Sequence, residues 1–303
     1  MKRVLVTGCL GFVGVNLASS LLAKGVEVHG IDNRSKVVGS TNNLELFERN
    51  GGVFHFCDFR NDNDILAVLA EIESIECIYH LGSQVSFKRS VERPRNDFEI
   101  NLLGTFNLLE FIRMKSPRTK LVYASTNQVY GALENIAVTE HSTRFDFTDL
   151  PRGVPETFAY DFLSPYGCSK GGGEAYCIDY ARVYGLDISV ARLGGIYGEH
   201  QYSTEDHGWI AFISEMIRTG TPYNRFGHGK QVRDVLHVSD IVNALEMLSQ
   251  RDWSGNCGVF NISGGDANTL SVLELIELVS EITGNESKDT TLEMRQADKL
   301  VMY

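Results

Sequence analysis

The sequence lacks a long apolar run, a cysteine pair and an excess of positive charge. No stretch reaches the roughly 18 apolar residues that a membrane-spanning helix needs, and residues 1–3 lead directly into a strand pattern. We therefore expect a cytoplasmic protein without a membrane partner. The 28 basic and 39 acidic residues give a net charge of −11, which excludes a broad basic surface for nucleic acid.

The six cysteines are scattered along the chain, without a Cys-x-x-Cys pair or a Cys/His cluster at the spacing of metal ligands. We expect buried free thiols and no metal site. The 303 residues, of which 43% are hydrophobic, suffice to bury a full core in one large domain or two unequal lobes.

Short β-branched runs alternate with amphipathic stretches of helical length along most of the chain. The runs lie at residues 4–7, 26–31, 53–56, 78–81, 121–124 and 188–191. The helical stretches include residues 62–71, 98–115 and 166–184. Alternation of this kind predicts an α/β fold with a doubly wound parallel sheet. Residues 134–164 show no clear periodicity, and we expect them to form a long loop over an active-site mouth.

A glycine pattern follows the first predicted strand and opens a helix. Gly8, Gly11 and Gly14 form G-x-x-G-x-x-G, with Phe12 and Val13 before the last glycine. Glycines let the backbone approach a pyrophosphate, and a helix N-terminus adds free N–H groups and partial positive charge. This context favours a dinucleotide-binding turn over a plain tight turn.

Asp32 ends the second predicted strand, where a carboxylate accepts hydrogen bonds from ribose hydroxyls and repels a 2′-phosphate. We therefore expect NAD as the cofactor, with Asn33 and Arg34 beside it. The Arg34 guanidinium leaves room for NADP, because it would bind the extra phosphate. Asp58, after the third strand, either bonds the adenine amino group or only caps a turn.

Further cofactor contacts are expected where other strands end. After the fourth strand, small residues would let the cofactor pass close to the backbone. The residues expected to contribute are Phe59, Leu81, Gly82, Ser83, Gln84 and Ser125.

Tyr166 and Lys170 stand four residues apart at the start of a predicted helix and therefore share one face. A free tyrosine has a pKa of about 10, but a nearby Lys⁺ favours the phenolate, which then takes a hydroxyl proton. Thr126, at the end of the fifth strand, supplies a hydroxyl that orients the same substrate oxygen. A surface Tyr-Lys pair is the alternative, and the glycine pattern argues against it.

Together these motifs resemble the extended short-chain dehydrogenase/reductases over nearly the whole chain. The matching positions are 8–14, Asp32, Asp58, 80–84, 101–105, 125–131, 166–170, 192–198 and 233–238. The resemblance implies a catalytic triad of Thr126, Tyr166 and Lys170, all in contact with NAD or substrate. It also implies that Asn101 supports Lys170, unless Asn101 only starts a helix, and that the chain forms a homodimer or homotetramer.

The alternation of strand and helix patterns, which weakens after residue 192, divides the chain into two parts. Residues 1–192 and 231–265 form a Rossmann domain that binds NAD, since strand-like runs resume at 231–236 and 259–262. Residues 193–230 and 266–303 form a smaller substrate-binding lobe. A substrate cleft between the two follows.

Family members that dehydrate nucleotide sugars carry an Asp-Glu pair after the catalytic Thr. Here Asn127 and Gln128 replace it, and amides do not exchange protons at neutral pH. Oxidation and return of the hydride remain, which is epimerase chemistry. Residues 125–131, 152–156, 163–171 and 201–209 resemble epimerases that invert C2 of CDP-linked deoxyhexoses. The alternatives are a nucleotide-sugar 4-epimerase, a 4,6-dehydratase or reductase, and a non-catalytic NAD-binding regulator.

The resemblance also implies a set of nucleotide-sugar contacts. These are Ser86, Thr126, Asn127, Gly195, Gln201, Arg233 and Arg295. The two arginines would clamp the diphosphate bidentately, or they form surface salt bridges. This chain departs from the family pattern at Gln128, where the resemblance implies Lys, and at Gly194-Gly195, where family members usually carry side chains that line the substrate pocket.

Overall fold

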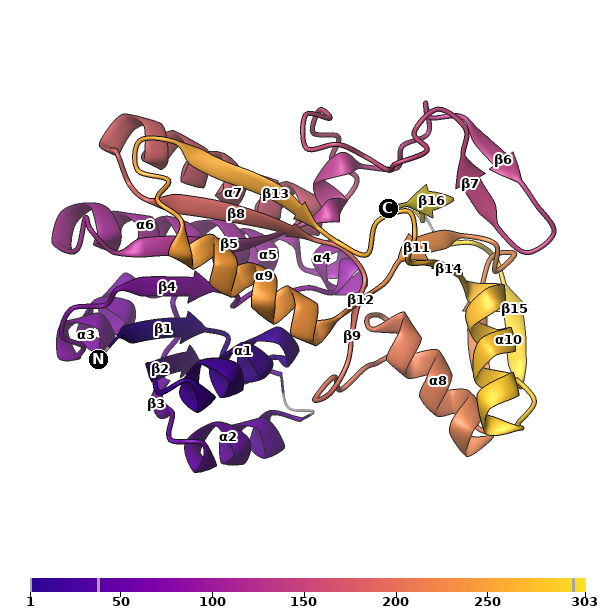
Figure 1. The fold of residues 1–303 in the computed structure, drawn as a ribbon, viewed down its shortest axis with the longest axis horizontal. Coiled ribbons are helices and arrows are strands. Elements are labelled where there is room, and N and C mark those ends of the chain that lie inside the picture. Colours follow the sequence, from indigo (N-terminus) through magenta and orange to yellow (C-terminus); the bar gives the residue numbers. More distant parts are fainter. Residues whose placement is uncertain (1, 37–38, 296–297) are drawn as a thin grey trace.

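The computed structural model describes residues 2–36, 39–295 and 298–303, which form a central sheet with helices on both faces and a smaller lobe at one end (Figure 1). The seven parallel strands have the order β13-β8-β5-β4-β1-β2-β3. Their bounds are β1 (Arg3–Thr7), β2 (Glu27–Asp32), β3 (Val53–Phe56), β4 (Cys77–His80), β5 (Lys120–Thr126), β8 (Ile188–Leu193) and β13 (Cys257–Ile262). The predicted doubly wound sheet is confirmed. Its order reverses between β1 and β4, so the ligand crevice lies at the carboxyl ends of these strands.

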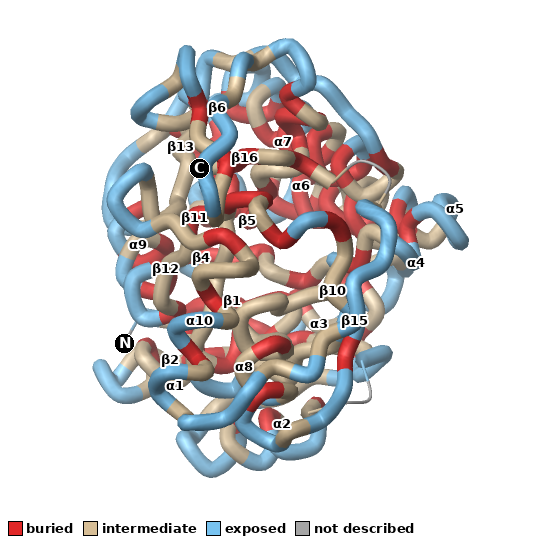
Figure 2. Tube along the Cα trace, turned by 90° about the vertical axis from the view of Figure 1, so that its right-hand side faces the viewer, coloured by how far each residue is buried: buried red, intermediate tan, exposed pale blue. Residues whose placement is uncertain are grey.

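Side chains of alternating strand residues enter two separate cores, one on each face of the sheet. Leu5 packs in the core under α3, α6 and α7, whereas Val4 and Val6 pack under α1 and α9. Figure 2 shows the buried residues gathered along β4, β5, α6 and α7, with exposed segments around them. The helices are α1 (Phe12–Ala23), α2 (Ser40–Arg49), α3 (Asp62–Glu71), α6 (Gly104–Lys115), α7 (Pro165–Tyr184) and α9 (Val238–Gln250).

The helix expected at residues 98–115 is interrupted. Residues Phe98–Leu103 form a π-helix, η1, before α6 begins, and two short helices precede it, α4 (Phe87–Glu92) and α5 (Pro94–Asp97). π-Turns occur often at functional sites, and η1 carries Asn101. The predicted helix at 166–184 is confirmed as α7.

The smaller lobe packs two helices over short strands. The helices α8 (Trp209–Thr219) and α10 (Val272–Thr283) share one apolar cluster. The strands β10 (Tyr223–Phe226) and β15 (Asp289–Leu292) form a pair. A second sheet places β11 (Val232–Asp234) between β14 (Thr269–Ser271) and β16 (Val301–Met302).

The strand expected at residues 231–236 does not join the central sheet. It splits into β11, in the smaller lobe, and β12 (Leu236–His237), which pairs with β9 (Ile196–Tyr197). An apolar run predicts a strand but not its partner, because partners are chosen by tertiary packing. The division into two domains at the stated residues stays a prediction.

The loop expected at residues 134–164 contains an antiparallel hairpin of β6 (Val138–Glu140) and β7 (Phe145–Phe147). Its apolar side chains form a small core with the 3-10 turn η2 (Asn127–Tyr130) and with β16. The segment of residues 134–164 is therefore anchored at the turn that directly follows β5.

Candidate active site

The glycine turn after β1 forms a cradle that side chains would block. Gly8 has a φ of 67°, and a Cβ on Gly14 would lie 2.1 Å from the Gly8 carbonyl oxygen. Gly11 is the N-cap of α1 and contributes no capping side chain, so the first N–H groups of that helix stay available for an anion. This geometry fits a dinucleotide pyrophosphate.

Asp32 ends β2 beside this cradle. Its carboxylate accepts hydrogen bonds from the backbone N–H of Arg34 at 2.7 Å and from that of Leu10 at 3.4 Å. Burial raises the pKa of Asp32, and these two hydrogen bonds act in the opposite direction. The carboxylate therefore lies beside the glycine cradle, and the Arg34 side chain is exposed. The contact of Asp32 with a ribose stays a prediction.

Asp58 lies at the next strand end and is held by Arg60 and Asn33. The Arg60 Nη2 donates to it at 2.5 Å, and the Asn33 Nδ2 donates at 3.0 Å. Asp58 also accepts from the backbone N–H of Arg60 at 3.1 Å and so caps the turn that follows β3. The adenine contact stays a prediction. Phe59 packs where a Cβ on Gly82 would lie, 2.5 Å from its ring.

Thr126, Tyr166 and Lys170 come together where β5 ends and α7 begins. Ser164 caps α7 by accepting from the Gly167 N–H at 3.1 Å, which fixes the turn that carries Tyr166. Burial raises the pKa of Tyr166, and a hydrogen bond with Thr126 lowers it in part. Burial lowers the pKa of Lys170 to about 7, and its ammonium lies 4.3 Å from the centre of the Tyr123 ring.

The effect of Lys170 on the pKa of the phenol stays a prediction. The net shift of Tyr166 is upward because desolvation of the phenol outweighs its hydrogen bond. Lys170 lies against the Tyr123 ring.

Asn101 does not contact Lys170 itself. Its Nδ2 donates to Ser169 Oγ at 3.0 Å and to the Gln84 carbonyl at 3.1 Å. Its Oδ1 accepts from Ser83 Oγ at 2.9 Å and from the Gln84 N–H at 3.0 Å. Every hydrogen-bonding position of the amide is therefore used, and Asn101 ties the loop after β4 to the residue before Lys170.

A buried ion pair beside the catalytic helix was missed from the sequence. Glu174, one turn after Lys170, pairs with Arg192 of β8, and the two side chains are 0% and 4% exposed. Ser125 Oγ donates to the same carboxylate at 2.6 Å, so its side chain points into this network. The expected cofactor contact of Ser125 stays a prediction. The i, i+4 spacing of Lys170 and Glu174 was the available signal.

Lys299 is a second residue that the sequence did not reveal. It comes from the smaller lobe, is 2% exposed, and donates from Nζ to the Asn127 carbonyl oxygen at 3.0 Å. Burial lowers its pKa to about 7, with Arg233 acting in the same direction. The lobe therefore contacts the turn that directly follows Thr126.

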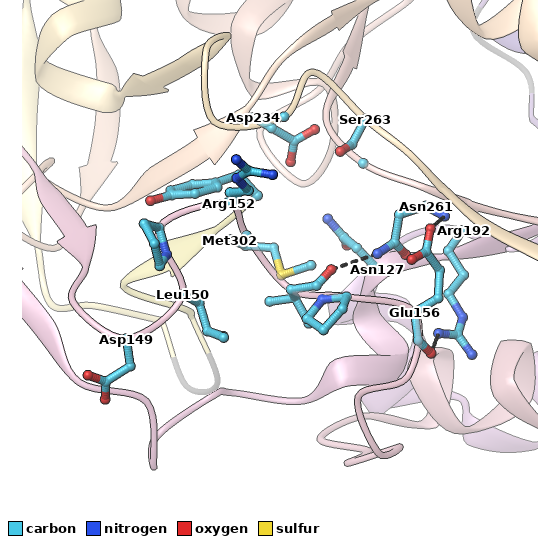
Figure 3. A pocket seen from close by; sticks show the side chains of 17 residues that line it. Asn127, Asp149, Leu150, Arg152, Glu156, Arg192, Asp234, Asn261, Ser263 and Met302 are labelled. Carbon is cyan, nitrogen blue, oxygen red and sulfur yellow. Dashed lines mark hydrogen bonds between the residues drawn. The ribbon is translucent and has the colours of Figure 1, made fainter.

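A cavity with a volume of about 510 Å³ lies beside this turn. Figure 3 shows Asp149, Leu150 and Arg152 on one side of it and Asn127 with Glu156 on the other. Neither the glycine cradle nor Tyr166 and Lys170 line it. The cavity thus lies next to the proposed catalytic residues, and Asn127, which directly follows Thr126, lines it. Residues of the 134–164 segment form part of its wall.

The two expected substrate arginines already have protein partners. Arg233 forms an ion pair with Asp298 and donates to the Val232 carbonyl at 2.8 Å. Arg295 donates to the Glu205 carbonyl at 3.1 Å, and its guanidinium lies 3.9 Å from the centre of the Phe226 ring. A diphosphate would have to displace or share these contacts.

The glycines at 194 and 195 are explained by Asp234. A Cβ on Gly194 would lie 2.4 Å from its carboxylate, and one on Gly195 would lie 2.3 Å from its carbonyl oxygen. Side chains such as those that family members usually carry at these positions would have no room.

Two further expected substrate contacts lie nearby in the fold. Ser86 caps α4, since its Oγ accepts from the Arg89 N–H at 3.2 Å. Gln201 donates to the Ile196 carbonyl at 3.1 Å, whereas its Oε1 is buried without a hydrogen-bond partner among the described residues. That acceptor suits a donor from a ligand. Both contacts stay predictions.

Cys168, on the exposed side of α7, corrects the expectation that all thiols are buried. Within residues 2–36, 39–295 and 298–303, the side chains of His, Cys, Asp and Glu form no group of three or more that would hold a metal ion. No described helix is both long and apolar enough to cross a bilayer.

Comparisons with known proteins agree with this geometry. The family model "NAD dependent epimerase/dehydratase family" matches residues 4–263. CDP-paratose 2-epimerase of Salmonella typhi is 40% identical over 310 residues, which cover 99% of this chain and 90% of that protein. UDP-glucose 4-epimerase of Mycolicibacterium smegmatis is 35% identical over 244 residues, or 80% of this chain and 72% of that protein.

Solved structures resemble the chain over nearly its full length. The UDP-glucose 4-epimerase of Thermotoga maritima, solved with UDP-glucose, has a TM-score of 0.85 at 29% identity. The match covers 99% of this chain and 89% of that one. The Thermus thermophilus UDP-glucose 4-epimerase with NAD has a TM-score of 0.82 at 30% identity, with coverages of 99% and 89%. The resemblance expected from the motifs is confirmed, and the chain belongs to the NAD-dependent epimerase/dehydratase family of extended short-chain dehydrogenase/reductases.

Proposed function

We propose that the protein is an NAD-dependent nucleotide-sugar epimerase that inverts C2 of a CDP-linked deoxyhexose through a transient keto sugar. The observation that carries this proposal is the pairing of Thr126, Tyr166 and Lys170 with the amides Asn127 and Gln128. Hydride chemistry has its residues, but elimination lacks its acid and base. The likeness to CDP-paratose 2-epimerase, which extends over 99% of the chain, supports the choice of sugar and carbon.

The residues divide the work as follows. The glycine cradle and Asp32 would hold NAD, which would supply the hydride-transfer chemistry in both directions. Tyr166 Oη takes the proton of the sugar hydroxyl and later gives it back, and the Thr126 hydroxyl, hydrogen-bonded to the phenol, orients that oxygen. Lys170 lies one helical turn from Tyr166. When its amine is protonated, it supplies a buried positive charge that favours the phenolate.

We assign the ligands by the same reasoning. The glycine cradle, Asp32 and the loop after β4 hold the cofactor, and the smaller lobe holds the nucleotide sugar. In this assignment Arg233 and Arg295 exchange their present partners for the diphosphate. The bidentate geometry of a guanidinium suits both a carboxylate and a phosphate, which makes such an exchange feasible.

We also propose a homodimer or a homotetramer built on η1 and α7. Large apolar side chains face solvent there, with Phe98 53%, Tyr176 41% and Val183 61% exposed. An apolar patch of this kind on one face marks a protein interface. Light scattering of the purified protein at several concentrations tests this part of the proposal.

The test of the reaction is a panel of CDP-, UDP-, GDP- and dTDP-linked sugars, followed by NMR of the products. We expect inversion at C2 with a CDP-linked deoxyhexose, without net consumption of NADH. A substrate deuterated at C2 should keep its label, because the hydride returns to the same molecule. Loss of the label to water, or inversion at C4 of a UDP-sugar, would overturn the proposal in favour of deprotonation or of a 4-epimerase.

A further inference from the structure

A line of buried polar side chains runs beneath the catalytic residues and has no part in the function proposed above. It joins Thr7 at the end of β1, His80 at the end of β4 and Thr105 in α6, and all three residues are 0% exposed. Groups buried to this extent need hydrogen-bond partners, so the direction of each bond can be worked out from its donors and acceptors.

The direction begins at Thr105. Its hydroxyl is 2.7 Å from the Asn101 carbonyl oxygen and donates there, because a carbonyl only accepts. The same hydroxyl lies 3.0 Å from His80 Nε2. Since its one proton is already used, it accepts from the ring, and His80 Nε2 therefore carries a proton.

The contacts of the other ring nitrogen, Nδ1, indicate the same tautomer. The Gly82 N–H donates to Thr7 Oγ1 at 3.0 Å, and Thr7 Oγ1 lies 2.7 Å from His80 Nδ1. An unprotonated Nδ1 accepts the Thr7 proton, which completes a chain from Gly82 to Asn101. In a doubly protonated ring, Nδ1–H would compete with the Thr7 proton for the same space.

The surroundings of the ring agree with a neutral imidazole. The ring lies edge-on to Phe59, at 5.3 Å between centroids, and near Tyr123 at 5.7 Å. Burial holds the pKa of His80 well below its ordinary value, and the Lys170 ammonium acts in the same direction.

The chain ends on the π-turn that carries Asn101. The Thr105 hydroxyl bonds the carbonyl four residues earlier and so ties the first turn of α6 to η1. From η1 the Asn101 amide donates to Ser169 at 3.0 Å, directly before Lys170 in α7. A shift of η1 would therefore move the support of the catalytic helix.

We propose that His80 is a positioning residue of the active site: as a neutral Nε2–H imidazole it locks, through Thr7 and Thr105, the turn from which Asn101 holds the start of α7. Its effect on turnover rests on the proposed function. The hydrogen-bond chain and the tautomer do not.

The first test replaces Thr105 by valine, which has the same shape but no hydroxyl. We expect kcat to fall about 10- to 100-fold, as a small misplacement of catalytic groups does, with NAD affinity little changed. The pH profile of kcat should shift as well, because the surroundings of Lys170 change. Thr105→Ser keeps the hydroxyl and is expected to restore most of the activity.

The matched control is Thr119→Val. Thr119 is 1% exposed, and its hydroxyl also donates to a backbone carbonyl, that of Ile75 at 2.7 Å, but away from the site. Both valine variants should lose some stability. If Thr105→Val matches Thr119→Val in kcat and in its pH profile, the positioning role is refuted.

The second test needs no turnover. In ¹⁵N-histidine spectra of the wild-type protein between pH 5 and 9, one of the eight histidines should stay neutral with its proton on Nε2, and Thr105→Val should perturb that signal. Titration of His80 in this range, or a proton on Nδ1, overturns the inference even if Thr105→Val does not fold. A protein that shows this tautomer but epimerises no sugar refutes the proposed function alone.

Discussion

The central sheet and the smaller lobe each bring one buried lysine against β5 and the turn that follows it. Lys170 and Lys299 are both 2% exposed, and burial lowers the pKa of each to about 7. They differ in what holds them. Lys170 is fixed to Tyr166 by one turn of α7, whereas Lys299 reaches the Asn127 carbonyl from a distant part of the chain.

This difference shows that the carboxyl end of β5 is contacted by two lysines, one placed by a helix that packs on the sheet and the other by the smaller lobe. Secondary structure alone sets the Tyr166–Lys170 spacing, so any protein with this helix keeps it. The contact of Lys299 exists only while the lobe is docked. In the proposed function Lys170 takes part in the chemistry, and we expect Lys299 to report whether the lobe is in place.

We expect the largest effect on turnover from a substitution in α7, which packs on the central sheet. Tyr166→Phe removes only the phenolic oxygen, and we expect kcat to fall about 10²- to 10⁴-fold, the contribution of a positioned acid or base. The variant should fold and bind NAD, as shown by near-ultraviolet circular dichroism and by a binding titration. Turnover near that of the wild type would remove Tyr166 from the mechanism.

The comparison predicts a smaller effect for the lobe. Lys299→Met keeps the length of the side chain and deletes its hydrogen bond to the turn after Thr126, so we expect kcat to fall about 10- to 100-fold. NAD affinity should stay unchanged, whereas Lys170→Met should lower it. Lys288→Met, at an exposed lysine of the same lobe, is the control. Equal kcat values for the two lobe variants would contradict the role of Lys299.

Both lysines should make stability depend on pH. Their pKa in the folded state is about 7, against about 10.4 in the unfolded chain. Between pH 7 and 9 the folded protein releases protons that the unfolded chain keeps, so the free energy of unfolding rises, by on the order of 2 kcal/mol for each lysine. Below pH 7 both states hold these protons, and the contribution no longer changes.

Urea unfolding at pH 7, 8 and 9 measures this rise. Lys170→Met and Lys299→Met should each flatten the increase relative to the wild type. An unchanged slope in either variant would show that the lysine concerned keeps its proton in the folded protein.

We expect the smallest effect from a substitution that weakens cofactor binding and leaves the smaller lobe unchanged. Asp32→Ala deletes a carboxylate at the end of β2, and we expect NAD affinity to fall about tenfold, as for one charge-assisted hydrogen bond. Discrimination against NADP should relax, because the repulsion of the 2′-phosphate is lost too. An unchanged preference in a fluorescence titration would place Asp32 away from the ribose.

The parts of the fold that local sequence determines were predictable. Strands β3 and β8 and helices α3 and α7 start within a residue of their expected positions, because periodicity reports which face of an element is buried. The same local rules locate the glycine turn and the pair Tyr166 and Lys170.

The remaining features depend on contacts between distant segments. The run at 231–236 gave no sign that it would divide between β11 and β12, because the strand partners are set by distant segments. Lys299 has no neighbouring sequence pattern that marks it as buried. Glu174 and Arg192 are 18 residues apart and meet only because α7 lies on β8.

The pair of Glu174 and Arg192 has a consequence for how this protein evolves. Removal of either partner would leave a lone charge in the core, at a cost of about 3–5 kcal/mol. Replacement of both by apolar residues would leave the buried Ser125 hydroxyl without the carboxylate that accepts its proton. Drift is therefore blocked at these two positions. A library that varies both at once should recover functional proteins only with the original pair. Such joint retention of the two charges would mark the junction between the catalytic helix and the sheet without any structure.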